Sequence, residues 1–204
     1  GPRGRFSRNA LAVAEVAFAL ALFAAAGLLL KSFLNLAQND PGYEPRDVLT
    51  FRLSLPETRY PDGPARRAFF DALRERLSSR SRVAASGFVN TLPLDQEKMI
   101  TMLDVEGRPR PANPMEMPRA SVRIVSPGFF PAMGIRLTSG RALLEADQAG
   151  APPVVVVNEA LARQYFEGED PLAARFHRSG SNVGVVSDFR QEGLDPEPEP
   201  EVYF

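Results

Sequence analysis

The longest apolar run of the chain lies close to its start. Residues 10–30 hold ten Leu, Val or Phe and nine Ala, and only Glu15 and Gly27 interrupt them. As an α-helix the run would be roughly 31 Å long, about the thickness of the hydrocarbon core of a bilayer. Ten large apolar side chains favour insertion by roughly 3–6 kcal/mol, which outweighs the cost of one carboxyl near the end of the segment. The pattern therefore predicts a transmembrane helix.

The charges on either side of the run predict its orientation. Three arginines, Arg3, Arg5 and Arg8, precede it, whereas only Lys31 follows it closely. The positive-inside rule then places the N-terminus in the cytoplasm and residues 38–204 on the opposite side of the membrane.

Two other interpretations of the run stay open. A signal peptide could be cut at Ala24–Ala26, although the apolar run goes on through Leu28–Leu30 and is longer than a usual signal core. A buried helix of a soluble domain would show a polar face, and this run has none. Apolar residues keep their helical spacing to about Ala37, where the turn residues 39–42 follow, so we expect a stem that continues the helix beyond the membrane.

Alanines fall on two opposite sides of this predicted helix. One side carries Ala10, Ala14, Ala17, Ala21 and Ala24, and the other carries Ala12, Ala19 and Ala26. Small side chains let helices approach closely in lipid, and Glu15 lies beside the second group, so we hypothesise that Glu15 faces another helix or a wet crevice. The alternative is that Ala is simply abundant and Glu15 extends toward the membrane surface. Unchanged assembly and activity after Glu15→Ala would contradict the hypothesis.

Beyond the stem, the pattern changes to alternating strands and helices. Val48–Leu55 alternates and is rich in β-formers, which predicts a strand. Ala65–Leu77 has apolar residues every four positions and predicts an amphipathic helix, and Val83–Leu92 predicts a second strand. Together they would form a β-α-β unit.

The residues after Leu92 are predicted to form mostly β-structure. Residues 94–119 are rich in Pro and Gly, and the Pro-rich acidic run 195–200 is expected to be a solvated loop. The connection at 177–182 is brief, leaving little strand before residue 183, and Pro131 is expected to limit one short helix to a single, distorted turn. Further strands are predicted at Ile100–Val105, Ser121–Val125, Val154–Val157, Val183–Val186 and Glu201–Phe204, with short helices at Gly128–Met133 and Glu159–Phe166.

Composition removes most enzyme classes. The 204 residues have a net charge of −1, which argues against nucleic-acid binding, and no Cys, which excludes disulfides and thiolate sites. One histidine, His177, cannot form a zinc-type cluster and is expected at the surface. Ser179–Ser181 lacks the setting of a nucleophile elbow, and its central Gly180 is expected to tolerate a cysteine probe. We predict no catalytic, cofactor-binding or metal-binding residue, and no enzyme activity.

Several blocks in a fixed order nevertheless resemble a known family. They follow the apolar segment and include VSPGFF at 125–130, Met133–Gly134, Gly140–Arg141 and VVNE at 156–159. From Asn9 onward the chain resembles the MacB/FtsX-type permeases of ABC transporters, with the duplicated orphan-permease branch as the best match.

The resemblance implies an α+β fold: an N-terminal transmembrane and stem helix, then a periplasmic β-α-β porter-like unit with an inserted mostly-β subdomain. It divides the chain into a cytoplasmic N-terminus (1–9), the helix and stem (10–37), the porter-like unit (38–92), the insert (93–182) and a truncated return to the porter-like unit (183–204). The resemblance therefore implies a fragment of a permease.

The resemblance also implies a function. The chain would lie in the bacterial inner membrane, with residues 38–204 in the periplasm, and its outer domain would transmit ATP-driven motion and engage cargo or partners in export or efflux. The implied partners are membrane lipid, an ABC ATPase subunit, a second permease half (an identical chain or an internal repeat) and a periplasmic adaptor or cargo, with no nucleic acid and no cofactor. The alternative is a membrane-anchored periplasmic binding or scaffold module without energy coupling. A third class, an anchored hydrolase, needs a polar catalytic cluster that the sequence does not indicate.

Overall fold

The computed structural model describes residues 2–38, 42–44, 47–92, 98–147, 150–189 and 198–204. The chain forms two compact units, Gly1–Asp40 and Pro41–Phe204. Residues 195–197 of the predicted acidic loop lie outside the described residues.

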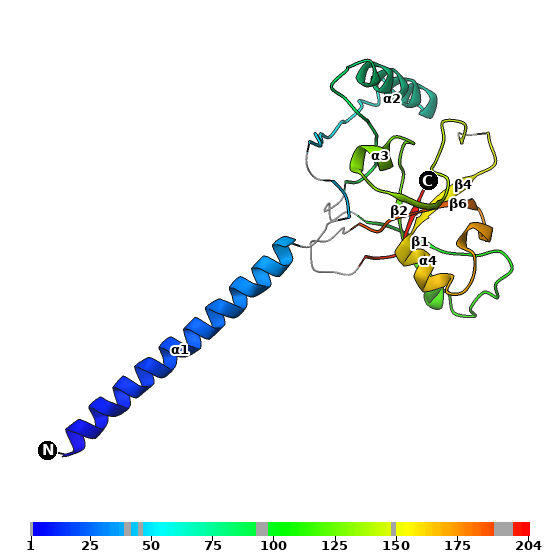
Figure 1. Ribbon diagram of the computed structural model, residues 1–204. Helices are drawn as coiled ribbons and strands as arrows, with labels where there is room; N and C mark the ends of the chain where they lie inside the picture. Colours follow the sequence, from blue (N-terminus) through cyan, green and yellow to red (C-terminus); the bar gives the residue numbers. More distant parts are fainter. Residues whose placement is uncertain (1, 39–41, 45–46, 93–97, 148–149, 190–197) are drawn as a thin grey trace. The chain divides into compact units, whose positions relative to one another are not determined.

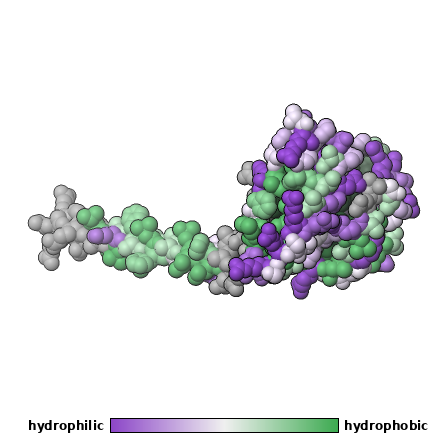
Figure 2. All heavy atoms as spheres, turned by 90° about the horizontal axis from the view of Figure 1, so that it is seen from above, coloured by the Kyte–Doolittle hydropathy of each residue, from purple (hydrophilic) through white to green (hydrophobic). Residues whose placement is uncertain are grey.

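The first unit is one helix, α1 (Pro2–Gln38), which runs without a break for 37 residues (Figure 1). Its segment Val13–Asn35 has a mean hydropathy of 2.3 and is long enough to cross a membrane, and none of it is buried. Figure 2 shows mostly hydrophobic side chains along it. The continuous helix predicted for the apolar run and the stem is therefore formed, and its apolar side chains are exposed in this chain.

The second unit is built on a mixed sheet. Among the described residues the strand order is β1-β2-β7-β4-β6-β3, with β5 paired to β6 outside this path. The β2–β7 and β4–β6 pairs are parallel and the other pairs are antiparallel. The strands are β1 (Met99–Met102), β2 (Arg119–Arg123), β3 (Leu137–Gly140), β4 (Val154–Asn158), β5 (Arg175–Phe176), β6 (Gly180–Val186) and β7 (Glu201–Tyr203). The remaining helices are α2 (Gly63–Ser78), α3 (Phe129–Met133) and α4 (Glu159–Tyr165), with the 3₁₀ turns η1 (Pro114–Glu116) and η2 (Pro171–Ala173).

The sheet buries a hydrophobic cluster on each face. In β4, Val155 and Val157 belong to one cluster and Val156 to the other, because successive side chains of a strand point to opposite faces. Helix α4 contributes Leu161 to the first cluster, and α3 contributes Phe129 and Phe130 to the second. The strand predicted at Val154–Val157 is thus confirmed, and Val155, Val156 and Val157 are fully buried in it.

Two predicted strands are not formed. Residues 48–55 have no strand structure, and Leu49 and Phe51 are 85% and 57% exposed. Residues 83–92 contain only an isolated bridge, between Val89 and Val125. Alternation shows which face of a segment is apolar, but a strand also needs a neighbouring backbone, and no described strand runs beside 48–55. The β-α-β unit is therefore represented only by its helix.

That helix, α2, is formed where the sequence predicts it, and it begins two residues earlier and ends one residue later than Ala65–Leu77. The Asp62 side chain accepts a hydrogen bond from the Ala65 amide at 2.8 Å, and Pro64 stands in the first turn, where its missing donor costs nothing. No residue of α2 is fully buried. Its Phe70 ring packs on Phe88 with a centroid distance of 4.9 Å.

Helix α3 explains the place of Pro131. The helix is a single turn that ends at Gly134, whose φ of 68° is the left-handed conformation glycine favours at a helix end. Pro131 lies in the first turn, where a backbone donor has no partner within the helix. The single turn is as predicted, but the proline fits it without distortion.

Strand β6 corrects two expectations about the connection at 177–182. The strand begins at Gly180, three residues before the predicted start, and pairs with the two-residue strand β5. Gly180 has a φ of +95°, and a Cβ there would lie 1.8 Å from the carbonyl oxygen of Pro153. It is therefore an unsuitable position for a cysteine probe.

The loop after β3 is closed by an ion pair. Arg141 donates to the Asp147 carboxylate at 2.6 and 3.0 Å, and the Leu144 amide donates to the same carboxylate at 2.8 Å. The hydrogen bond from Arg141 is the largest cause that lowers the pKa of Asp147 and raises that of Arg141. Glu145, which lies in the loop between Arg141 and Asp147, forms an ion pair with Arg74 of α2.

This pair makes stability depend on pH. Since the pKa of Asp147 is lower in the folded chain, the pair stabilises the fold above the unfolded value of about 3.9 and is lost as pH falls through the folded pKa. We expect Asp147→Asn to lower the unfolding temperature at pH 7, and the difference from wild type to shrink below about pH 4. Thermal unfolding of both chains between pH 7 and pH 3 measures this. A difference that stays constant over that range would contradict the assignment.

Candidate functional site

The only histidine lies at the surface, as predicted. His177 directly follows β5, its side chain is 45% exposed, and its Nδ1 lies 3.8 Å from Oε1 of Glu106. Glu106 also pairs with Arg175 at 3.3 Å. These are exposed ion pairs, which contribute little to stability.

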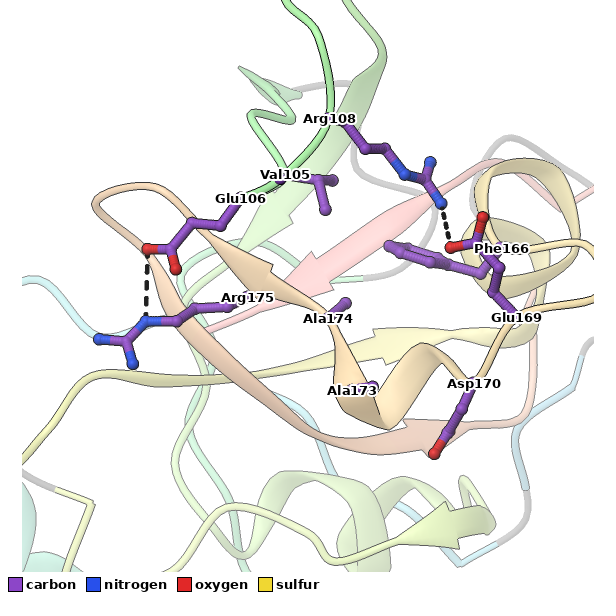
Figure 3. A pocket seen from close by; sticks show the side chains of 10 residues that line it. Val105, Glu106, Arg108, Phe166, Glu169, Asp170, Ala173, Ala174 and Arg175 are labelled. Carbon is purple, nitrogen blue, oxygen red and sulfur yellow. Dashed lines mark hydrogen bonds and ion pairs between the residues drawn. The ribbon is translucent and has the colours of Figure 1, made fainter.

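Close to them lies an open hollow of about 650 Å³ between residues 105–108 and 166–175 (Figure 3). Arg108 crosses one side of it, donating to the Tyr165 carbonyl and to Glu169, both at 2.7 Å, and lying 4.7 Å from the centre of the Phe166 ring.

Four of the five charged side chains around this hollow are paired with one another, and the fifth, Asp170, accepts a hydrogen bond from the Leu172 amide at 2.9 Å. Figure 3 shows Arg175 turned to Glu106 and Arg108 turned to Glu169. Across the described ranges no three His, Asp or Glu side chains are grouped so that they could hold a metal ion. The ion pairs and the cation–π contact join the two loops that border the hollow.

A buried polar cluster is the most unusual chemical feature of the second unit. Arg123 on β2 and Glu201 on β7 are 4% and 1% exposed, and the Arg123 guanidinium donates both to the Glu201 carboxylate and to the Thr91 carbonyl. Tyr203 is fully buried and donates its hydroxyl to Oε2 of Glu201 at 2.7 Å. We call Arg123, Glu201 and Tyr203 the buried cluster.

Parallel pairing explains how the buried cluster is assembled. Arg123 and Tyr203 are register partners on β2 and β7, and Glu201 lies two residues before Tyr203 on the same face. Burial, and then the nearby charge of Glu201, raise the pKa of Tyr203 well above its usual value, so the phenol stays a hydrogen-bond donor. A buried charged pair of this kind is satisfied only as a complete set.

Asn158, the last residue of β4, links strand β7 to helix α4. Its Oδ1 accepts from the amides of Leu161 at 3.0 Å and Glu201 at 2.9 Å, and its Nδ2 donates to the Glu199 carbonyl at 2.8 Å. One side chain therefore caps the helix and fixes the start of β7. In the sequence, Asn158 stands out only as part of the VVNE block, and nothing local indicates its bond to the Glu201 amide.

Comparison with known proteins gives the context of this architecture. The family model described as MacB-like periplasmic core domain matches residues 10–191. Among solved structures, the periplasmic region of MacB from Actinobacillus actinomycetemcomitans is similar with 23% identity and a TM-score of 0.39, over 65% of this chain and 53% of that chain. The extracellular domain of the noncanonic ABC-type transporter YknZ from Gram-positive bacteria is similar with 16% identity and a TM-score of 0.34, over 54% of this chain and 55% of that chain. The similarity thus spans about half the length of these structures. A search of curated proteins found no match.

Proposed function

The chain belongs to the family of MacB-like periplasmic core domains, and from this premise we propose that it is part of an inner-membrane ABC-type permease. Its outer domain transmits ATP-driven motion and engages cargo or partners in export or efflux. The energy comes from an ATPase on a separate polypeptide or domain, and a second permease half, either an identical chain or an internal repeat, completes the assembly. The chain itself catalyses no reaction.

One observation carries this proposal: α1 continues as a single helix from Pro2 through the apolar segment to Gln38, with no break between span and stem. Because an unbroken helix is held by hydrogen bonds along its whole length, tilt or rotation at one end is conveyed to the other. The second unit follows within a few residues. The proposed orientation places the N-terminus in the cytoplasm and residues 38–204 in the periplasm.

The orientation can be measured with a single cysteine, because the chain contains none. Ala112 is exposed, and Ala112→Cys changes one small side chain in a loop. We expect a membrane-impermeant thiol reagent to label this variant of the full-length protein in intact cells, and the labelled protein to resist alkaline extraction of the membranes. Release into the soluble fraction would indicate a cleaved signal, and labelling only after lysis would place the domain in the cytoplasm.

The same variant tests energy coupling. The full-length protein is co-expressed with its ATPase subunit, and the rate of labelling at position 112 is compared with and without ATP in membrane vesicles that expose both sides. We expect ATP to change the rate, and an ATPase subunit that cannot hydrolyse ATP to abolish the change. Equal rates under all conditions would favour the alternative, an anchored periplasmic binding or scaffold module.

A further inference from the structure

The chain enters its second unit through a close backbone contact at Gly42. A Cβ at this position would lie 2.2 Å from the carbonyl oxygen of Asp188 and 2.6 Å from Cα of Phe189, and the φ of Gly42 is +80°. Both facts require glycine here. The first described residue of the second unit is thus pressed against the segment that follows β6.

The next two residues extend this contact. The Tyr43 ring meets the Phe189 ring edge-on, with a centroid distance of 6.4 Å. The Glu44 amide donates to the Met133 carbonyl of α3 at 2.9 Å, and a Cβ at Gly134 would lie only 2.9 Å from Cβ of Glu44. We call residues 42–44 the docking segment.

Asp188, on which the docking segment lies, holds helix α4. Its carboxylate accepts from the Ala160 amide and from the Arg163 guanidinium, both at 2.7 Å. These contacts satisfy a first-turn donor of α4 and pair the helix with the end of β6.

Phe189, the other residue that the docking segment contacts, lies against Arg123 of the buried cluster. The Phe189 side chain is buried, and its ring centre lies 5.2 Å from Cζ of Arg123. This is the distance of a cation–π contact. The docking segment therefore touches two adjacent residues, of which Asp188 contacts helix α4 and Phe189 contacts Arg123 on strand β2.

The connection to the helix is short. Gly42 follows the last residue of α1, Gln38, by four positions in the sequence. Along the chain, Gly42 is therefore the first described residue of the second unit that a displacement of the helix end reaches.

We infer that the docking segment is the point at which force from the N-terminal helix enters the second unit, and that Asp188 passes it to α4 while Phe189 passes it to the buried cluster. The role of this route in transport rests on the proposed function, but the coupling of the docking segment to Asp188 and Phe189 does not.

The contact is tested by hydrogen exchange on the full chain in lipid nanodiscs. We expect Gly42→Ala to accelerate exchange in the first turn of α4 about tenfold, because the added Cβ displaces the backbone of Asp188 and weakens the cap. Gly107→Ala is the matched control: its φ of +84° imposes the same backbone strain, but nothing lies within 4 Å of its Cβ. Equal exchange in the two variants, or uniform acceleration in both α2 and α4, would overturn the inference.

A double-mutant cycle separates this route from general destabilisation. Asp188→Asn weakens the cap directly, so Gly42→Ala should add little further acceleration in that background. A full additive increase would overturn the inference.

If Gly42→Ala does not fold, Tyr43→Ala replaces it, with Tyr43→Phe as the control that keeps the ring. We expect Tyr43→Ala to accelerate exchange in the first turn of α4 by less than tenfold, and Tyr43→Phe to leave it unchanged. Unchanged exchange in the Tyr43→Ala variant would overturn the inference. No nucleotide or partner is needed, so this test can fail while the ATP-dependent labelling succeeds, and the reverse.

Discussion

Replacing Arg123 by methionine is expected to lower the free energy of unfolding by about 3–5 kcal/mol. The substitution keeps much of the side-chain volume but leaves the Glu201 carboxylate buried, with its positive partner removed. The Thr91 carbonyl loses a donor at the same time. Urea unfolding of the full-length protein, followed by pulse proteolysis, measures the change.

An exposed arginine provides the control. Arg110 pairs with Asp104 in a similar two-point contact but is 64% exposed, so Arg110→Met should change stability by less than about 1 kcal/mol. Adding Glu201→Gln to Arg123→Met removes the stranded charge and should recover part of the loss. If Arg123→Met costs no more than Arg110→Met, the buried cluster is not a stabilising unit.

Gly180→Ala is expected to destabilise the chain by about 2–5 kcal/mol. About 1–2 kcal/mol comes from a left-handed backbone at a residue with a side chain. A further 1–3 kcal/mol, roughly, comes from overpacking, because the new Cβ would lie 1.8 Å from the Pro153 carbonyl oxygen and 2.9 Å from Cβ of Pro153. Relief requires β6 to move away from the start of β4, where Ser181 is the register partner of Val154.

Gly107→Ala again separates the two causes, since it carries the backbone cost without the clash. It should lose only about 1–2 kcal/mol. Thermal unfolding of the two variants side by side gives the comparison, and equal losses would show that the contact with Pro153 relaxes at no cost.

Composition and local periodicity were enough to predict the elements whose signal is contained in their own residues. The apolar helix, the amphipathic α2 and the four-valine strand β4 are of this kind. Strand β3 was missed because its sequence, LTSG, has no apolar alternation, and all four residues are exposed at the edge of the sheet.

The buried cluster could not be predicted because its members are far apart in sequence. Arg123 and Glu201 are separated by 78 positions, and nothing in the local pattern RASVRIV distinguishes a buried arginine from an exposed one. The reverse error occurred at 48–55, where a clear alternation predicts a strand but no described neighbour pairs with it. Local patterns show what a segment can pair with, and tertiary structure decides whether it does.

The position of β7 has a consequence for how this unit is made. Its three residues, 201–203, come last in sequence among the described strands of the sheet, yet they join β2 on one side to β4 on the other. Until they are synthesised and in place, β1–β2 and β4–β6–β3 are two partial sheets, each with an open edge that can pair wrongly. Completing the sheet therefore depends on a late, long-range step, which predicts slow folding and a period of dependence on chaperones.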